Sequence, residues 1–221
     1  VVIDPGPMDT AHLRRIEQVA GPEVAAVILT HSHADHSEAA AEYAGRVAAP
    51  LLARDPDITG SEPLPSAGLD VAGVAIEVIP TPGHTADSVS IAVGDYLCTG
   101  DTVLGMGTTV VAHPDGRLAD YLASLQRLST WVAERGTTHL LPGHGPVLDD
   151  PLGALAHYLA HRQARLAAVA AAAAGRLAEP TSTLADEVVA IVYQDVPRHL
   201  WPAATLSVRA QLDYLRETAD H

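Results

Sequence analysis

Three histidines and one aspartate lie within six positions of the chain, in the segment His31–His36. The segment follows an apolar run, residues 24–29, which predicts a buried strand. Imidazole nitrogens and carboxylate oxygens are the ligands that zinc and neighbouring transition metals take in proteins. Side chains two positions apart in an extended segment point the same way, so His31 and His33 can bind one ion. Asp35 and His36 follow the bend and can bind a second.

Three more residues of the same kinds each follow a predicted strand. They are His84, Asp101 and His144, which come directly after the dipeptides Pro-Gly, Thr-Gly and Pro-Gly. Strand ends meet at one edge of a packed sheet, so ligands far apart in the chain can converge there. We expect one set of His31, His33 and His84, and another of Asp35, His36 and His144. Asp101 can bridge the two sets, because a carboxylate has two oxygens.

Two sets of ligands predict a dinuclear centre. Two ions about 3.5 Å apart can share a water and lower its pKa, so a bridging hydroxide would be the nucleophile. Such a mechanism needs no serine or cysteine, and we expect no catalytic role for Cys98, the single cysteine. Asp35, besides binding metal, is expected to take up or return a proton. The other histidines are interpreted as surface or packing residues: His12, His113, His139, His157, His161, His199 and His221.

Strands alternate with helices around these residues. The sequence predicts a strand at residues 1–3, a helix from Asp9 to about Ala20, the strand at 24–29 and a short helix at 37–44, which together indicate an α/β layered body. Later predicted strands are 47–53, 88–93, 96–99 and 139–141, with a hairpin over 71–78 that turns near residues 72–73 and an amphipathic helix over 118–132. Residues 54–67 contain three prolines and one glycine and predict a mobile loop.

The pattern changes near residue 150. Strand signals disappear, and helical patterns remain at about 152–177, 184–194 and 203–217. We therefore predict a hydrolase domain over residues 1–150 and a small all-α domain over residues 151–221.

Composition limits the function classes. One cysteine excludes an internal disulfide and favours a reducing compartment, so we expect a cytoplasmic protein. No apolar run is long enough to predict a membrane span. The net charge of −14 repels polyanions at long range, although bound dications would offset part of it.

The motifs resemble those of the metallo-β-lactamase superfamily. His31 to His36 fits the pattern H-x-H-x-D-H, and residues 82–84, 100–101 and 142–145 fit the remaining motifs in order and spacing. The resemblance implies an αββα sandwich with a dinuclear centre at one edge. It usually holds two zinc ions, with iron and manganese as alternatives, and the seven candidate residues carry over as its ligands. Asp4 matches the early Asp-x-Gly motif, which lies beneath the site.

A narrower resemblance is to the β-lactamase-like protein 2 subgroup, which includes a mitochondrial single-strand endoribonuclease. Residues 104–110, residues 120–125 and the C-terminal helices carry it. It implies that the C-terminal domain is winged-helix-like and that Gly107, Thr108 and Thr109 contact substrate. Only three residues precede Asp4, where the superfamily normally has strands. We expect those strands, and a piece of the loop at 54–67, to be missing from the sequence, or the sandwich to be incomplete.

These patterns predict a metal-dependent hydrolase with two candidate substrate classes. The subgroup resemblance favours single-stranded RNA phosphodiesters. The negative net charge of the protein disfavours small substrates less than it disfavours polyanions. It therefore favours small substrates such as the thioesters of glyoxalase II. β-Lactam hydrolysis is less expected, because no export signal is visible. Two other classes of function stay open. One is a non-catalytic module whose helices bind a partner, and the other is an iron-dependent oxidoreductase. We expect no membrane partner, and a homodimer through the helices after residue 150 stays open.

Overall fold

The first sheet has three short apolar strands connected by helices, and a fourth, polar strand at its edge. In the computed structural model, which describes residues 1–219, its strands are β1 (Val2–Ile3), β2 (Val27–Ile28), β3 (Leu51–Ala53) and β4 (Ser61–Pro63). All neighbours in this order are parallel. The connecting helices are α1 (Thr10–Ala20), α2 (Ala34–Ser37) and α3 (Ala40–Val47).

The second sheet is mostly antiparallel. Its strands are β5 (Leu69–Val71), β6 (Val74–Pro80), β7 (Val89–Val93), β8 (Tyr96–Gly100) and β9 (His139–Pro142), paired in that order. Only β8 and β9 are parallel among these pairs, and α4 (Leu118–Arg135) lies between them in the chain.

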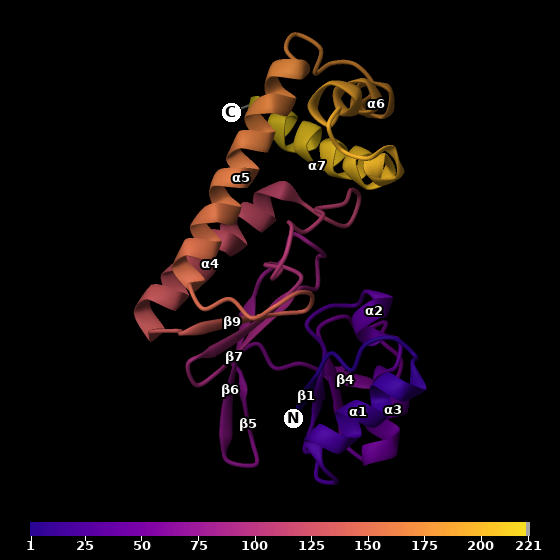
Figure 1. Ribbon diagram of the computed structural model, residues 1–221, viewed down its shortest axis with the longest axis vertical. Helices are drawn as coiled ribbons and strands as arrows, with labels where there is room; N and C mark the ends of the chain where they lie inside the picture. The colour runs from indigo at the N-terminus through magenta and orange to yellow at the C-terminus, as the bar shows by residue number, and fades with distance from the viewer. Residues whose placement is uncertain (220–221) are drawn as a thin grey trace.

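Alternating side chains build three apolar layers. Ile28 of β2 and Ile91 of β7 meet between the two sheets. Val27 faces the opposite way and packs with Leu13 of α1, while Leu97 packs with the buried face of α4. The two sheets are therefore sandwiched between helices, and the predicted αββα arrangement is confirmed (Figure 1).

Three helices and a 3₁₀ turn follow the sandwich. They are α5 (Pro151–Ala172), α6 (Thr181–Val192), η1 (Arg198–Leu200) and α7 (Trp201–Ala219). Leu155 of α5 packs beside α4, whereas Val169 of the same helix packs with α6 and α7 in a separate core. Figure 1 shows α5 running from beside α4 to the helices at the far end of the molecule.

Some predicted boundaries are wrong. The loop expected at 54–67 contains β4, whose Pro63 is tolerated because the strand lies at the sheet edge. The strand expected at 47–53 begins only at Leu51, because α3 extends to Val47 and Ala48 is left-handed. The strand expected at 24–29 is reduced to β2. No helix among residues 1–219 is long and apolar enough to cross a membrane. His221 lies outside the described residues.

Candidate metal centre

All seven predicted ligands lie at one edge of the sandwich, in the segments that follow β2, β6, β8 and β9. Two residues separate His31 from the end of β2, and three residues separate His84 from the end of β6. The parallel pairing of β8 and β9 brings Asp101 beside His144, because Gly100 pairs with Pro142 across the two strands. The Gly143 N–H also donates to the Gly100 carbonyl at 2.9 Å.

His31, His33 and His84 form the first group. Their ligand atoms all lie within 4.8 Å of one another. His84 Nε2 lies 3.0 Å from His33 Nδ1. His31 is 2% exposed, and its Nε2 is buried without a hydrogen-bond partner among the described residues. The three imidazoles therefore converge on one point.

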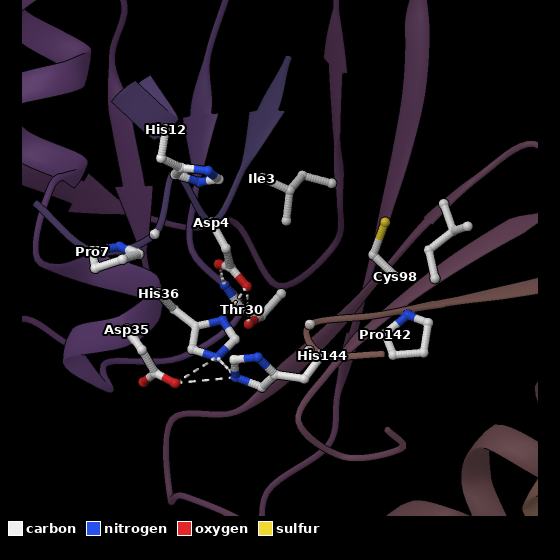
Figure 2. Close-up of a pocket in the computed structure, with 14 residues that line it drawn as sticks. Ile3, Asp4, Pro7, His12, Thr30, Asp35, His36, Cys98, Pro142 and His144 are labelled. Atoms are coloured by element: carbon white, nitrogen blue, oxygen red, sulfur yellow. Dashed lines mark hydrogen bonds and ion pairs between the residues drawn. The ribbon is translucent and has the colours of Figure 1, made fainter. Parts of the chain in front are cut away.

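Asp35, His36 and His144 form the second group, again within 4.8 Å. His144 Nε2 lies 3.0 Å from Asp35 Oδ2 and 3.2 Å from His36 Nε2. Figure 2 shows these three side chains pointing toward one another, with Asp4 and Thr30 behind His36. They line a cavity of about 350 Å³.

Asp101 lies between the two groups. Its carboxylate is 3.4 Å from His36 Nε2 and 3.6 Å from His144 Nε2 on one side, and 3.8 Å from His84 Nε2 on the other. Its Oδ1 is buried without a hydrogen-bond partner in the described part of the chain. One carboxylate thus reaches both groups.

The donor sets fit metal ions. Two nitrogens bound to one tetrahedral zinc ion lie about 3.3 Å apart, given ordinary zinc–nitrogen lengths. The nitrogen pairs of the two groups, at 3.0 and 3.2 Å, are close to this spacing. A metal would also satisfy the buried atoms His31 Nε2 and Asp101 Oδ1, which are otherwise costly to bury. The cluster can therefore hold divalent metal ions.

Asp4 and Thr30 hold His36 from behind. The Asp4 carboxylate accepts hydrogen bonds from the Thr30 backbone N–H at 2.7 Å, from the Thr30 hydroxyl at 2.6 Å and from His36 Nδ1 at 2.9 Å. With Nδ1 occupied, His36 presents Nε2 to Asp101 and His144. Such a partner fixes the tautomer and orientation of a metal-binding histidine. Asp4 thus lies beneath the cluster, where the resemblance placed it.

His84 is held by the segment that follows Asp101. Its Nδ1 donates to the Val110 carbonyl at 2.7 Å and lies 3.1 Å from the Thr109 hydroxyl. Its Nε2 consequently faces His33. Sequence reasoning missed Thr30 and Val110. Thr30 could have been suspected from its place before His31, but nothing local in the sequence indicates the Val110 carbonyl.

The electrostatics of the two groups differ. Burial and the surrounding histidines lower the pKa of His31 to about 2. Burial likewise lowers the pKa of His84, so both rings are neutral and free to bind metal. Burial also acts to lower the pKa of His36, but Asp101 and Asp4 outweigh it and raise that pKa to about 10. The second group therefore favours positive charge, which either a proton or a metal ion supplies.

Gly143 leaves the space that the two groups need. A Cβ at this position would lie 2.6 Å from His36 Cε1 and 2.7 Å from Asp101 Oδ1. Any larger residue would therefore displace two predicted ligands.

The three residues predicted to contact substrate differ in their exposure to solvent. Gly107 is exposed and Thr108 is partly exposed, whereas Thr109 is 4% exposed with its hydroxyl against His84. The Thr109 side chain therefore faces His84 rather than solvent. His139, which is partly exposed, stacks on Tyr96 away from the cluster.

Comparison with known proteins decides the family. A profile described as the metallo-β-lactamase superfamily matches residues 1–59, and one described as a β-lactamase-associated winged helix domain matches residues 185–218. The Beta-lactamase-like protein 2 homolog of Drosophila melanogaster is 29% identical over 98% of this chain and 78% of that protein. The chain belongs to the metallo-β-lactamase superfamily. Proteins of this superfamily are metal-dependent hydrolases, and the resemblance to β-lactamase-like protein 2 is confirmed.

The Caenorhabditis elegans homologue of β-lactamase-like protein 2 is 32% identical over 75% of this chain. The chain spans only 58% of that relative's length. A metallo-β-lactamase family protein from Thermus thermophilus has the same fold, with a TM-score of 0.76 and 22% identity over 98% of this chain and 84% of that one.

A second solved structure carries metal. It is TTHA1623 in a di-iron-bound form, 26% identical, with a TM-score of 0.57 over 71% of this chain and 86% of that one.

The winged helix match covers most of α6 and α7. The helices α6 and α7 thus carry the β-lactamase-associated winged helix domain, and the winged-helix-like character predicted from the sequence is confirmed for this part of the chain.

Proposed function

We propose that this chain is a dinuclear zinc hydrolase that cleaves phosphodiester bonds in single-stranded RNA. The observation that carries the dinuclear assignment is the position of Asp101, within 3.8 Å of histidine nitrogens from both groups. When bound, two divalent ions supply an activated water and neutralise charge that develops on the attacked and leaving oxygens. The seven predicted ligands would hold them.

Asp35 is the proposed proton carrier. Its side chain is 55% exposed, the most open of the acidic groups in the cluster, and its Oδ2 lies 3.0 Å from His144 Nε2. A carboxylate at the solvent side of the centre can receive a proton from the attacking water and return it to the leaving oxygen. The buried Asp101 is 10% exposed and lacks this access.

RNA is the proposed substrate because of the similarity to β-lactamase-like protein 2 homologues along nearly the whole chain. Gly107 is exposed and Thr108 partly exposed in the segment that adjoins His84, and both are proposed to contact the substrate backbone.

A thioester or small ester is the second candidate. Two observations favour it: the net charge of −14, which disfavours a polyanion, and the exposed apolar side chains of Met106 and Val110 beside the cluster. An acyl chain could pack on these side chains and bury their apolar surface.

Iron is the alternative to zinc. His and Asp ligands suit both metals, and the solved structure of TTHA1623 contains two irons. Elemental analysis of the purified protein separates the two cases.

The test combines metal content with two substrates. We expect two zinc ions per chain and cleavage of a single-stranded oligoribonucleotide. The Asp101→Ala variant should lose at least one ion and at least a hundredfold in rate, and the matched control Asp57→Ala, at an exposed loop position, should lose neither. Cleavage of a generic thioester without RNA cleavage would replace the first candidate with the second. Full metal occupancy and full rate in Asp101→Ala would refute the dinuclear assignment.

A further inference from the structure

A second cavity, of about 340 Å³, lies behind the segment that holds His84. Its walls are residues 108–110 on one side and helices α5, α6 and α7 with their connections on the other. Its polar lining includes Thr108, His161, Arg162, Arg165 and Ser207. Apart from Thr108, which is proposed above to contact the substrate, none of these side chains has a role in the function described so far.

The lining of this cavity is basic, although the protein is acidic. The chain has 27 acidic residues against 13 arginines, yet none of the lining residues is Asp or Glu. Two arginines and a histidine from one turn of α5 line it instead. His161 and Arg165 are four residues apart and so lie on the same face of the helix. The local charge is therefore opposite to that of the whole molecule.

Arg162 is buried without an acidic partner. It is 7% exposed, and one of its terminal nitrogens donates to the Thr109 carbonyl. Its Nε is buried without a hydrogen-bond partner within residues 1–219. Neither Arg162 nor Arg165 forms an ion pair with a carboxylate in that range. Burying a cation is costly unless an anion or several hydrogen bonds compensate it.

Two other polar groups of the lining also indicate that the cavity suits an anion. The Nδ1 of His161 is also buried without a partner in the described chain. Arg165 bonds the Val192 carbonyl at 3.0 Å and lies over the Tyr193 ring at 4.7 Å, which fixes its guanidinium at the cavity wall. An oxyanion entering here would meet arginine N–H groups, the geometry that suits phosphate.

The cavity shares a wall with the metal centre. The Thr109 carbonyl accepts from Arg162, whereas the next carbonyl, that of Val110, accepts from His84 Nδ1. One peptide segment therefore separates a predicted metal ligand from the basic cavity. The basic cavity and the metal centre are therefore neighbours, with two adjacent carbonyls facing one each.

We propose that this cavity binds a phosphate group of the substrate adjacent to the bond that is cleaved. This inference rests on the proposed phosphodiesterase function. It assigns a specificity role to α5, α6 and α7, since the arginines come from the C-terminal helices and the shared wall comes from the sandwich. A substrate that carries a second phosphate would bind more tightly than one that carries only the scissile phosphodiester.

Binding of inorganic phosphate tests the cavity without turnover. Calorimetric titration of the metal-loaded protein should show a binding event that Arg165→Gln weakens at least tenfold. The matched control Arg14→Gln, which removes the same charge at an exposed position of α1, should leave it unchanged. Phosphate bound only at the metal centre would persist in Arg165→Gln, and equal binding in the two variants would overturn the proposal.

Two further variants guard against loss of folding. Arg165→Lys keeps the charge and should restore part of the phosphate binding. Ser207→Asp places a carboxylate among the arginines, so it should abolish phosphate binding while the thermal midpoint stays equal or rises. A Ser207→Asp variant that is folded and still binds phosphate normally would contradict the assignment.

Turnover separates the two proposals. We expect Arg165→Gln to raise KM about tenfold for a 5′-phosphorylated diribonucleotide, with little change for the same dinucleotide lacking that phosphate. Equal KM changes for the two substrates would overturn the cavity's role in specificity. Absence of any RNA cleavage by the wild type would refute the proposed function, while the phosphate titration would still decide whether the cavity binds an oxyanion.

Discussion

Asp4 illustrates how one residue can prepare a metal site without being counted among its ligands. Its carboxylate accepts three hydrogen bonds, two from Thr30 and one from His36. These contacts tie the end of β1 to the end of β2 at the point where the histidine segment begins. The His36 ring is therefore oriented before any ion arrives.

Replacing Asp4 with Asn should weaken the second group of ligands. The amide keeps one acceptor but loses the charge and the second acceptor, so the Thr30 and His36 contacts cannot all be kept. Partners of metal-binding histidines typically contribute about 10–100-fold in metal affinity. We expect a zinc titration against a chromophoric chelator to show a loss of this size for one of two ions. Asp57→Asn, at an exposed loop position, should bind both ions normally, and an unchanged titration in Asp4→Asn would argue against the orienting role.

At the scale of elements, the helix α4 anchors the segment that follows Asp101. The Tyr121 hydroxyl donates to the Thr102 carbonyl at 2.6 Å, and both residues are fully buried. Gly83, just before His84, lies against the backbone of the same tyrosine, and a Cβ there would collide with it. One turn of α4 thus supports two strand ends that carry predicted ligands.

Tyr121→Phe should destabilise the protein by about 1–3 kcal/mol, because it leaves the buried Thr102 carbonyl without a partner. Urea unfolding of the metal-loaded protein measures this difference. Tyr96→Phe is the matched control: Tyr96 is 47% exposed, so the loss of its hydroxyl should change stability very little. Equal midpoints for the two variants would show that the α4 contact does not stabilise the segment.

Some of these elements and contacts could be predicted from the sequence, and others could not. The ligand segments were predictable because each follows an apolar run, and strand ends of one sheet meet at one edge. The strand β4 was not, since Ser61–Pro63 has no apolar alternation and pairs only because β3 offers a free edge. The role of the Val110 carbonyl depends on how the 102–110 segment packs, and any residue type provides a carbonyl. His161 was interpreted as a surface or packing residue, and only the position of α5 brings it to a basic cavity.

The whole molecule has two groups of cores, and the helices α5 and α7 contribute buried residues to both. Leu155 in the first half of α5 packs in the α4 core of the sandwich, and Val169 in its second half packs with α6 and α7. Because α5 is continuous between them, losing either core should remove a face that the helix needs. We therefore expect the sandwich and the C-terminal helices to unfold together, although only the sandwich carries the predicted metal ligands.

The chain provides a natural reporter for each part. It has two tryptophans: Trp131 packs against the α4 core, and Trp201 packs with α6 and α7. The variants Trp201→Phe and Trp131→Phe each leave a single reporter. Metal removal should lower the thermal midpoint on the order of 10 °C, since an ion at a thousandfold excess over its Kd contributes about 4 kcal/mol.

Cooperative coupling predicts that chelation shifts both fluorescence transitions by the same amount. The Trp201 signal is the decisive one, because that residue packs only with the C-terminal helices and touches none of the predicted ligands. Metal can reach its midpoint through α5, through Ala210 of α7 in the α4 core, and through the contact of the 108–110 segment with Arg162. If the Trp131 midpoint falls on chelation while the Trp201 midpoint stays fixed, the C-terminal helices fold independently, and α5 is a tether rather than a shared structural element.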